Sequence, residues 1–292
     1  MITGNLEAVD SGLLRSMDHP REILVADRFP ALRAKLLDLL AGLSGDDWDR
    51  PTAAGQWSVK DVCAHLLGGD VFIISGRRDQ FRLPGPPVEN HQQLIALIDR
   101  VNAEWVQAAR RISPQLLREF LALTAPAVEN CFASLDPMAM NGAVSWAGPE
   151  RAPVWFDVAR EFTERWHHQQ QIRDATSRPP LYDPYFFAPV LDAFVRAFPH
   201  NFRHTEAPIG TTVRLSISGE AGGTWFIQKQ SDHWLLLLDS PSELAADVVI
   251  PQDTAWRLFT KGLTAEVARS RSTVHGDDSF AVPIFSTVAI IG

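Results

Sequence analysis

Residues 153–175 read PVWFDVAREFTERWHHQQQIRDA, and this stretch predicts a long helix that opens at Pro153. Val158, Phe162 and Trp166 recur at helical spacing and form an apolar face. The opposite face carries a stripe of polar residues, namely Asp157, Glu161, Glu164, His168 and Gln171. Taken alone, such a stripe favours a helix that turns its polar face to solvent.

Two residues of this stripe have the spacing of metal ligands. Glu164 and His168 lie four residues apart, so their side chains lie above one another on a helix and can bind one ion. An earlier helix carries His65 in the run VKDVCAHLLG, residues 59–68, and can supply a third ligand. Three protein ligands with an open fourth position are typical of catalytic zinc-type sites, whereas structural zinc is normally closed by four ligands. The pattern therefore favours a catalytic site.

A structural interpretation also exists for His65, because Val62 and Leu66 lie beside it and a buried histidine can bond a backbone carbonyl. If His65 is instead a ligand, Asp61 and Gln171 are candidates for hydrogen bonds to the ligating imidazoles. Asp61 could equally be exposed to solvent. The sequence leaves both interpretations open.

Other histidines and both cysteines compete less well for a metal. His167 lies about 100° around the helix from its neighbour, so the two cannot easily face one ion. His200 and His204 are four residues apart, but a proline directly before them disfavours a regular helix, and we expect them at the surface. Cys63 and Cys131 lie in apolar helical contexts and are predicted to be packing residues.

Composition limits the class of protein. A chain of 292 residues is long enough for two domains, and 46% hydrophobic with 21% charged residues is typical of globular proteins. The net charge of −8 argues against a nucleic-acid surface, so we expect a small-molecule partner. Residues 1–12 lack a basic region followed by an apolar run, and no membrane-spanning run occurs, so we expect a cytoplasmic protein. The oligomeric state stays open.

The chain divides into two halves of different periodicity. The first is all-α, with expected helices at 29–43, from Ser58, from 90, at 113–135 and at 153–175. Two prolines at 179 and 180 cannot continue a helix, so we place the boundary there and predict domains 1–179 and 180–292. After a helix at 185–198, the second domain has expected strands around 213–217, 224–230, 233–238 and 246–250. With helices at 252–259 and 263–269 and a closing segment at 277–291, it is an α+β domain with a mainly antiparallel sheet.

Two segments carry a family resemblance. Residues 56–68, QWSVKDVCAHLLG, resemble the G-W-S/T-V-x-D-x-x-x-H-L motif of the DinB-like, mycothiol-dependent maleylpyruvate isomerase family. Residues 164–173, ERWHHQQQIR, resemble its second motif, in which Glu and His four apart precede Asp-Ile-Arg. Residues 185–292, with GEAGGTW at 219–225 and AWRL at 255–258, are similar to its C-terminal domain, which is related to sterol carrier proteins.

The resemblance implies a two-domain α+β protein with an N-terminal DinB-like four-helix bundle that binds a divalent metal, with zinc the expected ion. It assigns His65, Glu164 and His168 as the ligands. It further implies an isomerase or S-transferase in which mycothiol or another low-molecular-weight thiol adds to a cis double bond and leaves after rotation. The metal would bind and deprotonate the thiol.

The chain departs from the family at Gln171, where an acid is common, and the family's carboxylate-binding arginine has no matching position here. Two alternative functions use the same features. A metal-dependent hydrolase would hold water at the open position. A non-catalytic protein would bind an apolar small molecule or lipid in the C-terminal domain, with the metal site vestigial.

Overall fold

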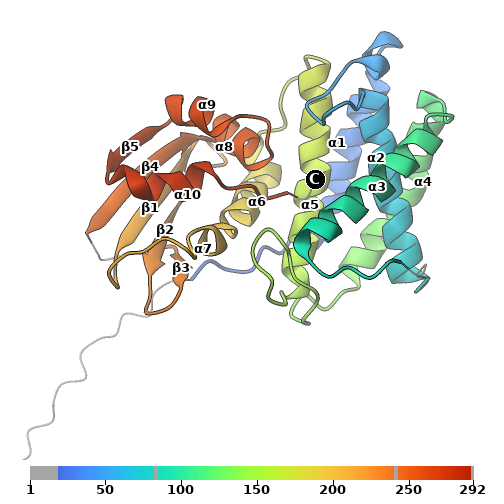
Figure 1. The fold of residues 1–292 in the computed structure, drawn as a ribbon. Coiled ribbons are helices and arrows are strands. Elements are labelled where there is room, and N and C mark those ends of the chain that lie inside the picture. The colour runs from blue at the N-terminus through green and yellow to red at the C-terminus, as the bar shows by residue number, and fades with distance from the viewer. Residues whose placement is uncertain (1–18, 82–84, 240–242, 291–292) are drawn as a thin grey trace, which may run out of the picture.

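The computed structural model describes residues 19–81, 85–239 and 243–290. A helical region and a region with a sheet lie side by side, as Figure 1 shows. The expectation for residues 1–12 lies outside the described residues. Within the described part of the chain, no helix is both long and apolar enough to cross a membrane.

The long helices of the N-terminal region begin where the sequence predicts. They are α1 (Phe29–Ala41), α2 (Val59–Ile73), α3 (His91–Ala109), α4 (Pro114–Ala133) and α5 (Val154–Ala175). The cap of α2 is a reciprocal pair, because the Asp61 backbone N–H donates to the Ser58 hydroxyl at 3.3 Å and the Ser58 N–H donates to the Asp61 carboxylate at 3.2 Å. Ser113 caps α4 in the same way as Ser58 caps α2, by accepting from an N–H one turn later.

Helices α1, α2, α4 and α5 pack against one another, and α3 lies along α2. The α2–α3 contact is close because Gly68 has no side chain. A Cβ atom there would lie 2.6 Å from the ring of Trp105, whose indole N–H donates to the Ala64 carbonyl at 2.7 Å. The expected helical bundle is thus present, with α3 packed on its outside.

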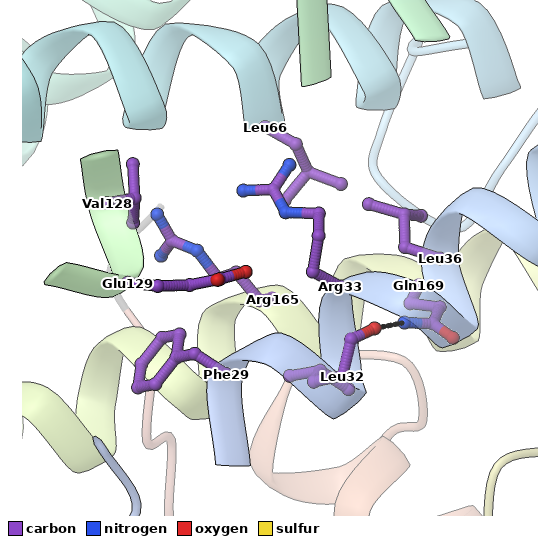
Figure 2. A pocket seen from close by; sticks show the side chains of 9 residues that line it. All are labelled: Phe29, Leu32, Arg33, Leu36, Leu66, Val128, Glu129, Arg165 and Gln169. Carbon is purple, nitrogen blue, oxygen red and sulfur yellow. Dashed lines mark hydrogen bonds between the residues drawn. The ribbon is translucent and has the colours of Figure 1, made fainter. Parts of the chain in front are cut away.

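A buried carboxylate on α2, Asp70, joins four helices. It is fully buried and accepts two hydrogen bonds of 2.7 Å from Arg33 of α1. Arg165 of α5 donates to it at 3.1 Å and the Thr124 hydroxyl of α4 at 2.6 Å. Both guanidinium groups face a small pocket between these helices, where the Gln169 amide also donates to the Leu32 carbonyl at 3.3 Å, as Figure 2 shows.

The C-terminal region is a mixed sheet covered by helices, which confirms the expected α+β class. Within the described residues the sheet has the strand order β3-β2-β1-β4-β5. Its strands are β1 (Thr212–Ser218), β2 (Gly223–Lys229), β3 (Trp234–Leu237), β4 (Leu244–Pro251) and β5 (Thr273–Gly276). The helices around it are α6 (Pro184–Val195), α7 (Phe198–Asn201), α8 (Gln252–Phe259), α9 (Ala265–Ser270) and α10 (Ala281–Phe285).

The sheet is mainly antiparallel, as predicted, but two of its features differ from expectation. Strands β1 and β4 pair in parallel, whereas the other pairings are antiparallel. Strand β5 was not predicted, because Val274 is its only residue that is not exposed and a short edge strand of this kind has no alternating apolar pattern.

Helix α5 packs against both regions of the protein. Ile172 joins the apolar core between α1, α2 and α4, while Phe162 and Trp166 belong to the core that continues into α6 and the sheet. The Trp166 ring stacks on Phe187 of α6 at 4.4 Å and meets Trp256 of α8 edge-on at 5.6 Å. The prolines at 179 and 180 lie in the non-helical stretch between α5 and α6, and the domain boundary there stays a prediction.

We expect Asp70→Asn to lower the free energy of unfolding by about 3–5 kcal/mol, because it leaves two buried guanidinium groups without their shared counter-charge. Denaturant titration followed by circular dichroism measures this loss. The matched control is Asp79→Asn, which removes the exposed partner of Arg78 and should leave stability nearly unchanged. Equal effects of the two substitutions would contradict a structural role for Asp70.

Candidate metal centre

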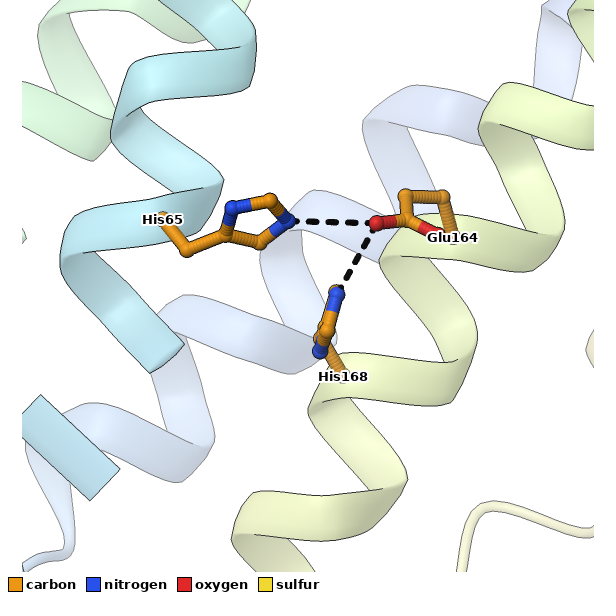
Figure 3. A group of neighbouring side chains, drawn as sticks. All are labelled: His65, Glu164 and His168. Carbon is orange, nitrogen blue, oxygen red and sulfur yellow. Dashed lines mark hydrogen bonds and ion pairs between the residues drawn. The ribbon is translucent and has the colours of Figure 1, made fainter. Parts of the chain in front are cut away.

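The structure brings His65, Glu164 and His168 together between α2 and α5, as Figure 3 shows. The Nε2 atom of His65 lies 3.2 Å from Oε1 of Glu164, and Nε2 of His168 lies 2.9 Å from the same oxygen. One nitrogen or oxygen from each residue lies within 4.8 Å of the others. The two imidazoles therefore converge on one carboxylate from two helices.

The polar stripe of α5 does not form the solvated face that the stripe alone favours: Asp157, His168 and Gln171 are buried, and Glu161 and Glu164 are half-buried. The reason is that α5 is covered by the bundle on one side and by the C-terminal region on the other. Its buried polar residues are Asp157, Thr163, Arg165, His167, His168, Gln169, Gln170 and Gln171. Polar groups buried at this density need partners, and the site lies among them.

A chain of hydrogen bonds extends from the triad into the interior. The Gln171 side-chain oxygen accepts from Nδ1 of His168 at 2.8 Å, and its amide nitrogen donates to Nε2 of His167 at 2.9 Å. Because His167 accepts at Nε2, its neutral ring carries the proton on Nδ1. That Nδ1 is buried and has no partner among the described residues. Gln171 thus holds His168 with Nε2 directed at Glu164, as expected for an outer partner of a metal ligand.

The Asp61 carboxylate, for which a hydrogen bond to His65 and solvent exposure were both open, is buried and bonded to other residues. It accepts two hydrogen bonds of 2.9 Å from Arg110 and one from the Ser58 backbone. These partners lie at the first turn of α2, and they hold the start of the helix that carries His65. In the loop before α2, the ring of Trp57 lies beside His65, with the two ring centroids 5.0 Å apart.

The charges of the triad are strongly coupled. Burial would raise the pKa of Glu164, but the charge of His168 and hydrogen bonds from both imidazoles hold it well below its usual range. Burial lowers the pKa of His65. It would also lower that of His168, but Glu164 raises it. Burial lowers the pKa of His167 to about 3, so this ring is neutral.

The donor set fits a divalent transition metal. Two ligands bound to one zinc at about 2.0–2.2 Å can lie no more than about 4.4 Å apart. The 2.9 and 3.2 Å separations of the two imidazole nitrogens from Glu164 Oε1 are below this limit, and all three ligand atoms lie within 4.8 Å of one another. Two imidazoles and a carboxylate without a thiolate are a known ligand set of catalytic zinc. The Glu164 side chain keeps 32% of its surface exposed, so this member of the triad is in contact with solvent.

The other histidines and the two cysteines considered as metal ligands are not part of the triad. His168, and not His167, contacts Glu164. His200 is half-buried on α7 and His204 is exposed after it. Cys63 is fully buried, and burial raises the pKa of its thiol, which agrees with a packing residue. Cys131 is half-buried and packs against the core.

Arginines beside the triad were not identified from the sequence. Arg160, one turn before Glu164, donates to Asp157 at 2.9 Å and to Glu161 at 2.5 Å. Arg77, in the turn after α2, also pairs with Asp157. Arginine and acid at helical spacing are common on exposed helices, so the sequence carries no signal that separates this buried cluster from a surface one.

Comparison with known proteins identifies the N-terminal region. Residues 29–173 match the family model described as the mycothiol maleylpyruvate isomerase N-terminal domain, which confirms the resemblance carried by the two motifs. Two solved structures of the mycothiol-dependent maleylpyruvate isomerase, one of them a histidine-to-alanine mutant, are similar to this chain. Each is 8% identical to it, and the similarity covers 80% of this chain and 86% of the isomerase chain. Their TM-scores are 0.49 for the mutant and 0.48 for the other.

A ubiquinone synthesis protein, UbiJ-SCP2, is 17% identical over 30% of this chain and 84% of its own, with a TM-score of 0.22. No curated protein matches the chain.

We expect the purified protein to bind one equivalent of zinc, measured by isothermal titration after treatment with a chelator. His65→Ala and Glu164→Gln should each weaken binding by at least about 100-fold, because each removes one of three ligands. The control is His204→Ala, an exposed histidine distant in sequence from the triad. Zinc binding that survives both triad substitutions unchanged would place the metal elsewhere.

A separate pair of substitutions tests the outer hydrogen bond. Gln171→Leu removes the acceptor for His168 and should weaken zinc binding by about 10–100-fold. Gln171→Glu keeps an acceptor there and should bind zinc at least as tightly as the wild type. Gln115→Leu, at an exposed site on α4, controls for the loss of an amide. Wild-type affinity in Gln171→Leu would show that the bond to His168 has no effect on the site.

Proposed function

Residues 29–173 of this protein belong to the mycothiol maleylpyruvate isomerase N-terminal domain family, and from this premise we propose a metal-dependent enzyme that uses a low-molecular-weight thiol. The reaction type is isomerisation or S-transfer on a small molecule. The observation that carries the proposal is the convergence of His65, Glu164 and His168, with the Glu164 side chain partly exposed to solvent. Zinc is the proposed ion and mycothiol the proposed thiol.

A metal held by His65, Glu164 and His168 would supply a positive charge that lowers the pKa of a nearby thiol, which would favour the thiolate nucleophile near neutral pH. The chain's own residues orient this chemistry. His65 approaches from α2, while Glu164 and His168 approach from α5. Gln171 fixes the ring of His168, and the buried His167 beyond it stays neutral. The partly exposed Glu164 marks the side from which thiol and substrate approach.

In an isomerisation, the thiolate would form a carbon–sulfur bond at one end of a cis double bond, and the electron pair of the double bond would move to the adjoining acceptor group. Rotation about the resulting single bond and loss of the thiolate would give the trans product, so atoms and charge balance without a further reactant. In S-transfer, the same adduct would take a proton and be released. The first bond formed is the same in both reactions.

A cobalt-substituted sample tests thiol use directly. We expect mycothiol, or cysteine as a simpler thiol, to produce an absorption band of thiolate bound to cobalt, and Glu164→Gln to abolish it. His204→Ala should behave as the wild type. Thiol-dependent conversion of a cis-unsaturated ketoacid to its trans isomer, followed by absorbance, is the expected activity.

Two outcomes would contradict the proposal. Turnover of esters or amides without added thiol would favour a hydrolase in which water occupies the open position. Co-purified lipid bound equally with and without metal, together with no thiol band, would favour a binding protein.

A further inference from the structure

Two adjacent glycines on α2 have different surroundings. A Cβ atom at Gly68 would collide with Trp105, so close packing against α3 explains that glycine. A Cβ atom at Gly69 would have no heavy atom of its surroundings within 4 Å. Glycine inside a helix is destabilising relative to alanine, and here no contact within the protein requires it. The position of a side chain at Gly69 is therefore not filled by another described part of the protein.

This open space lies beside the metal triad. Gly69 is four residues after His65 and shares its face of α2. Because a Cβ bond tilts toward the start of its helix, a side chain at this position would extend toward the turn that carries His65. Contacts from His65 to Glu164 and from Arg77 to Asp157 show that α2 and α5 run antiparallel. Gly69 lies between these two contacts along α2.

Phe72 lies one turn beyond Gly69, and 76% of its surface is exposed. Its neighbour Val71 is also exposed. Phe72 is on the same helix as the candidate ligand His65, and a large exposed apolar side chain can form part of a surface that a ligand covers. Phe72 therefore provides an apolar contact at the outer end of the open space.

The charges nearby are already balanced. Arg160 is engaged by Asp157 and Glu161, and Arg77 by Asp157. Neither arginine is a free counter-ion for an anionic group between α2 and α5. The chemistry of this face therefore suits an uncharged, apolar group.

We propose that Gly69 keeps open the path by which the organic part of a ligand reaches the metal site, and that Phe72 contacts an apolar or aromatic group of that ligand. The proposal rests on the proposed function, because it places the ligand beside a metal-bound thiol. Gly69 is a specificity-determining residue: the absence of a side chain there admits ligands with a bulky apolar group. The substrate class is a small molecule with an aromatic or branched aliphatic part.

The test uses full-length cobalt-substituted protein and two probe thiols, benzyl mercaptan and 2-mercaptoethanol, titrated by the thiolate-to-cobalt absorption band. Wild type should prefer benzyl mercaptan, and Gly69→Leu should weaken its binding by at least about tenfold, because the new side chain fills the path. Phe72→Ser should reduce the preference for benzyl mercaptan by roughly fivefold through lost apolar contact.

The matched control is Gly76→Leu, which also enters open space but lies in the turn after α2, two turns beyond Gly69. It should leave both affinities unchanged. The cobalt spectrum without thiol should be the same in all variants, which shows that the metal site is intact. Gly69→Ala keeps the test valid if the leucine variant folds poorly: it should raise the melting temperature and still weaken benzyl mercaptan binding.

Equal benzyl mercaptan binding by wild type, Gly69→Ala and Gly69→Leu would overturn this inference and leave the proposed function standing. A cobalt protein that gives no thiolate band with either thiol would overturn the proposed function and this inference with it.

Discussion

The pairing of buried Asp70 with Arg33 and Arg165 is the constraint on which the helical region depends. Moving a charge out of water costs several kcal/mol unless a partner meets it, so these helices can pack only in the register that brings the three groups together. Asp70 lies five residues after His65, and Arg165 is next to Glu164. The contact that fixes α2 against α5 therefore also fixes His65 opposite Glu164, and the fold and the candidate site share one determinant.

The same principle extends along α5. The buried polar residues of a helix need partners, and Glu161, Arg165, Gln170 and Gln171 each have at least one in a neighbouring element or one turn away. Among the described residues, Nδ1 of His167 and Nε of Arg165 have none. Such a network allows few alternative arrangements of the side chains. His168 contacts Gln171 through one nitrogen and Glu164 through the other, and a ligand held in this way would lose little freedom on coordination.

Local signals in the sequence predicted most of the helices and strands, but they did not predict which faces of these elements are buried. Ser58 and Asp61 identify the start of α2, because capping depends on residues three positions apart. The burial of the polar face of α5 could not be predicted in the same way, because it depends on residues distant in sequence: His65 contacts Glu164 and Arg77 contacts Asp157. Strand β5 and the parallel β1–β4 pair were missed for the same reason, since both depend on contacts distant in sequence. The triad was identified because two of its members lie on one helix.

The residue that departs from the family pattern, Gln171, bears on what the open position would hold. An acid there would add a second negative charge beside the one on Glu164, whereas the amide adds none and can also donate to His167. If His65, His167 and His168 are neutral around a divalent ion, the positive charge of the ion exceeds the single negative charge of Glu164. An anion at the open position would then neutralise the remainder in a partly buried setting, where charge balance matters most. In the proposed reaction a thiolate would satisfy this requirement and a neutral thiol would not, so the amide would favour deprotonation of a thiol at the metal.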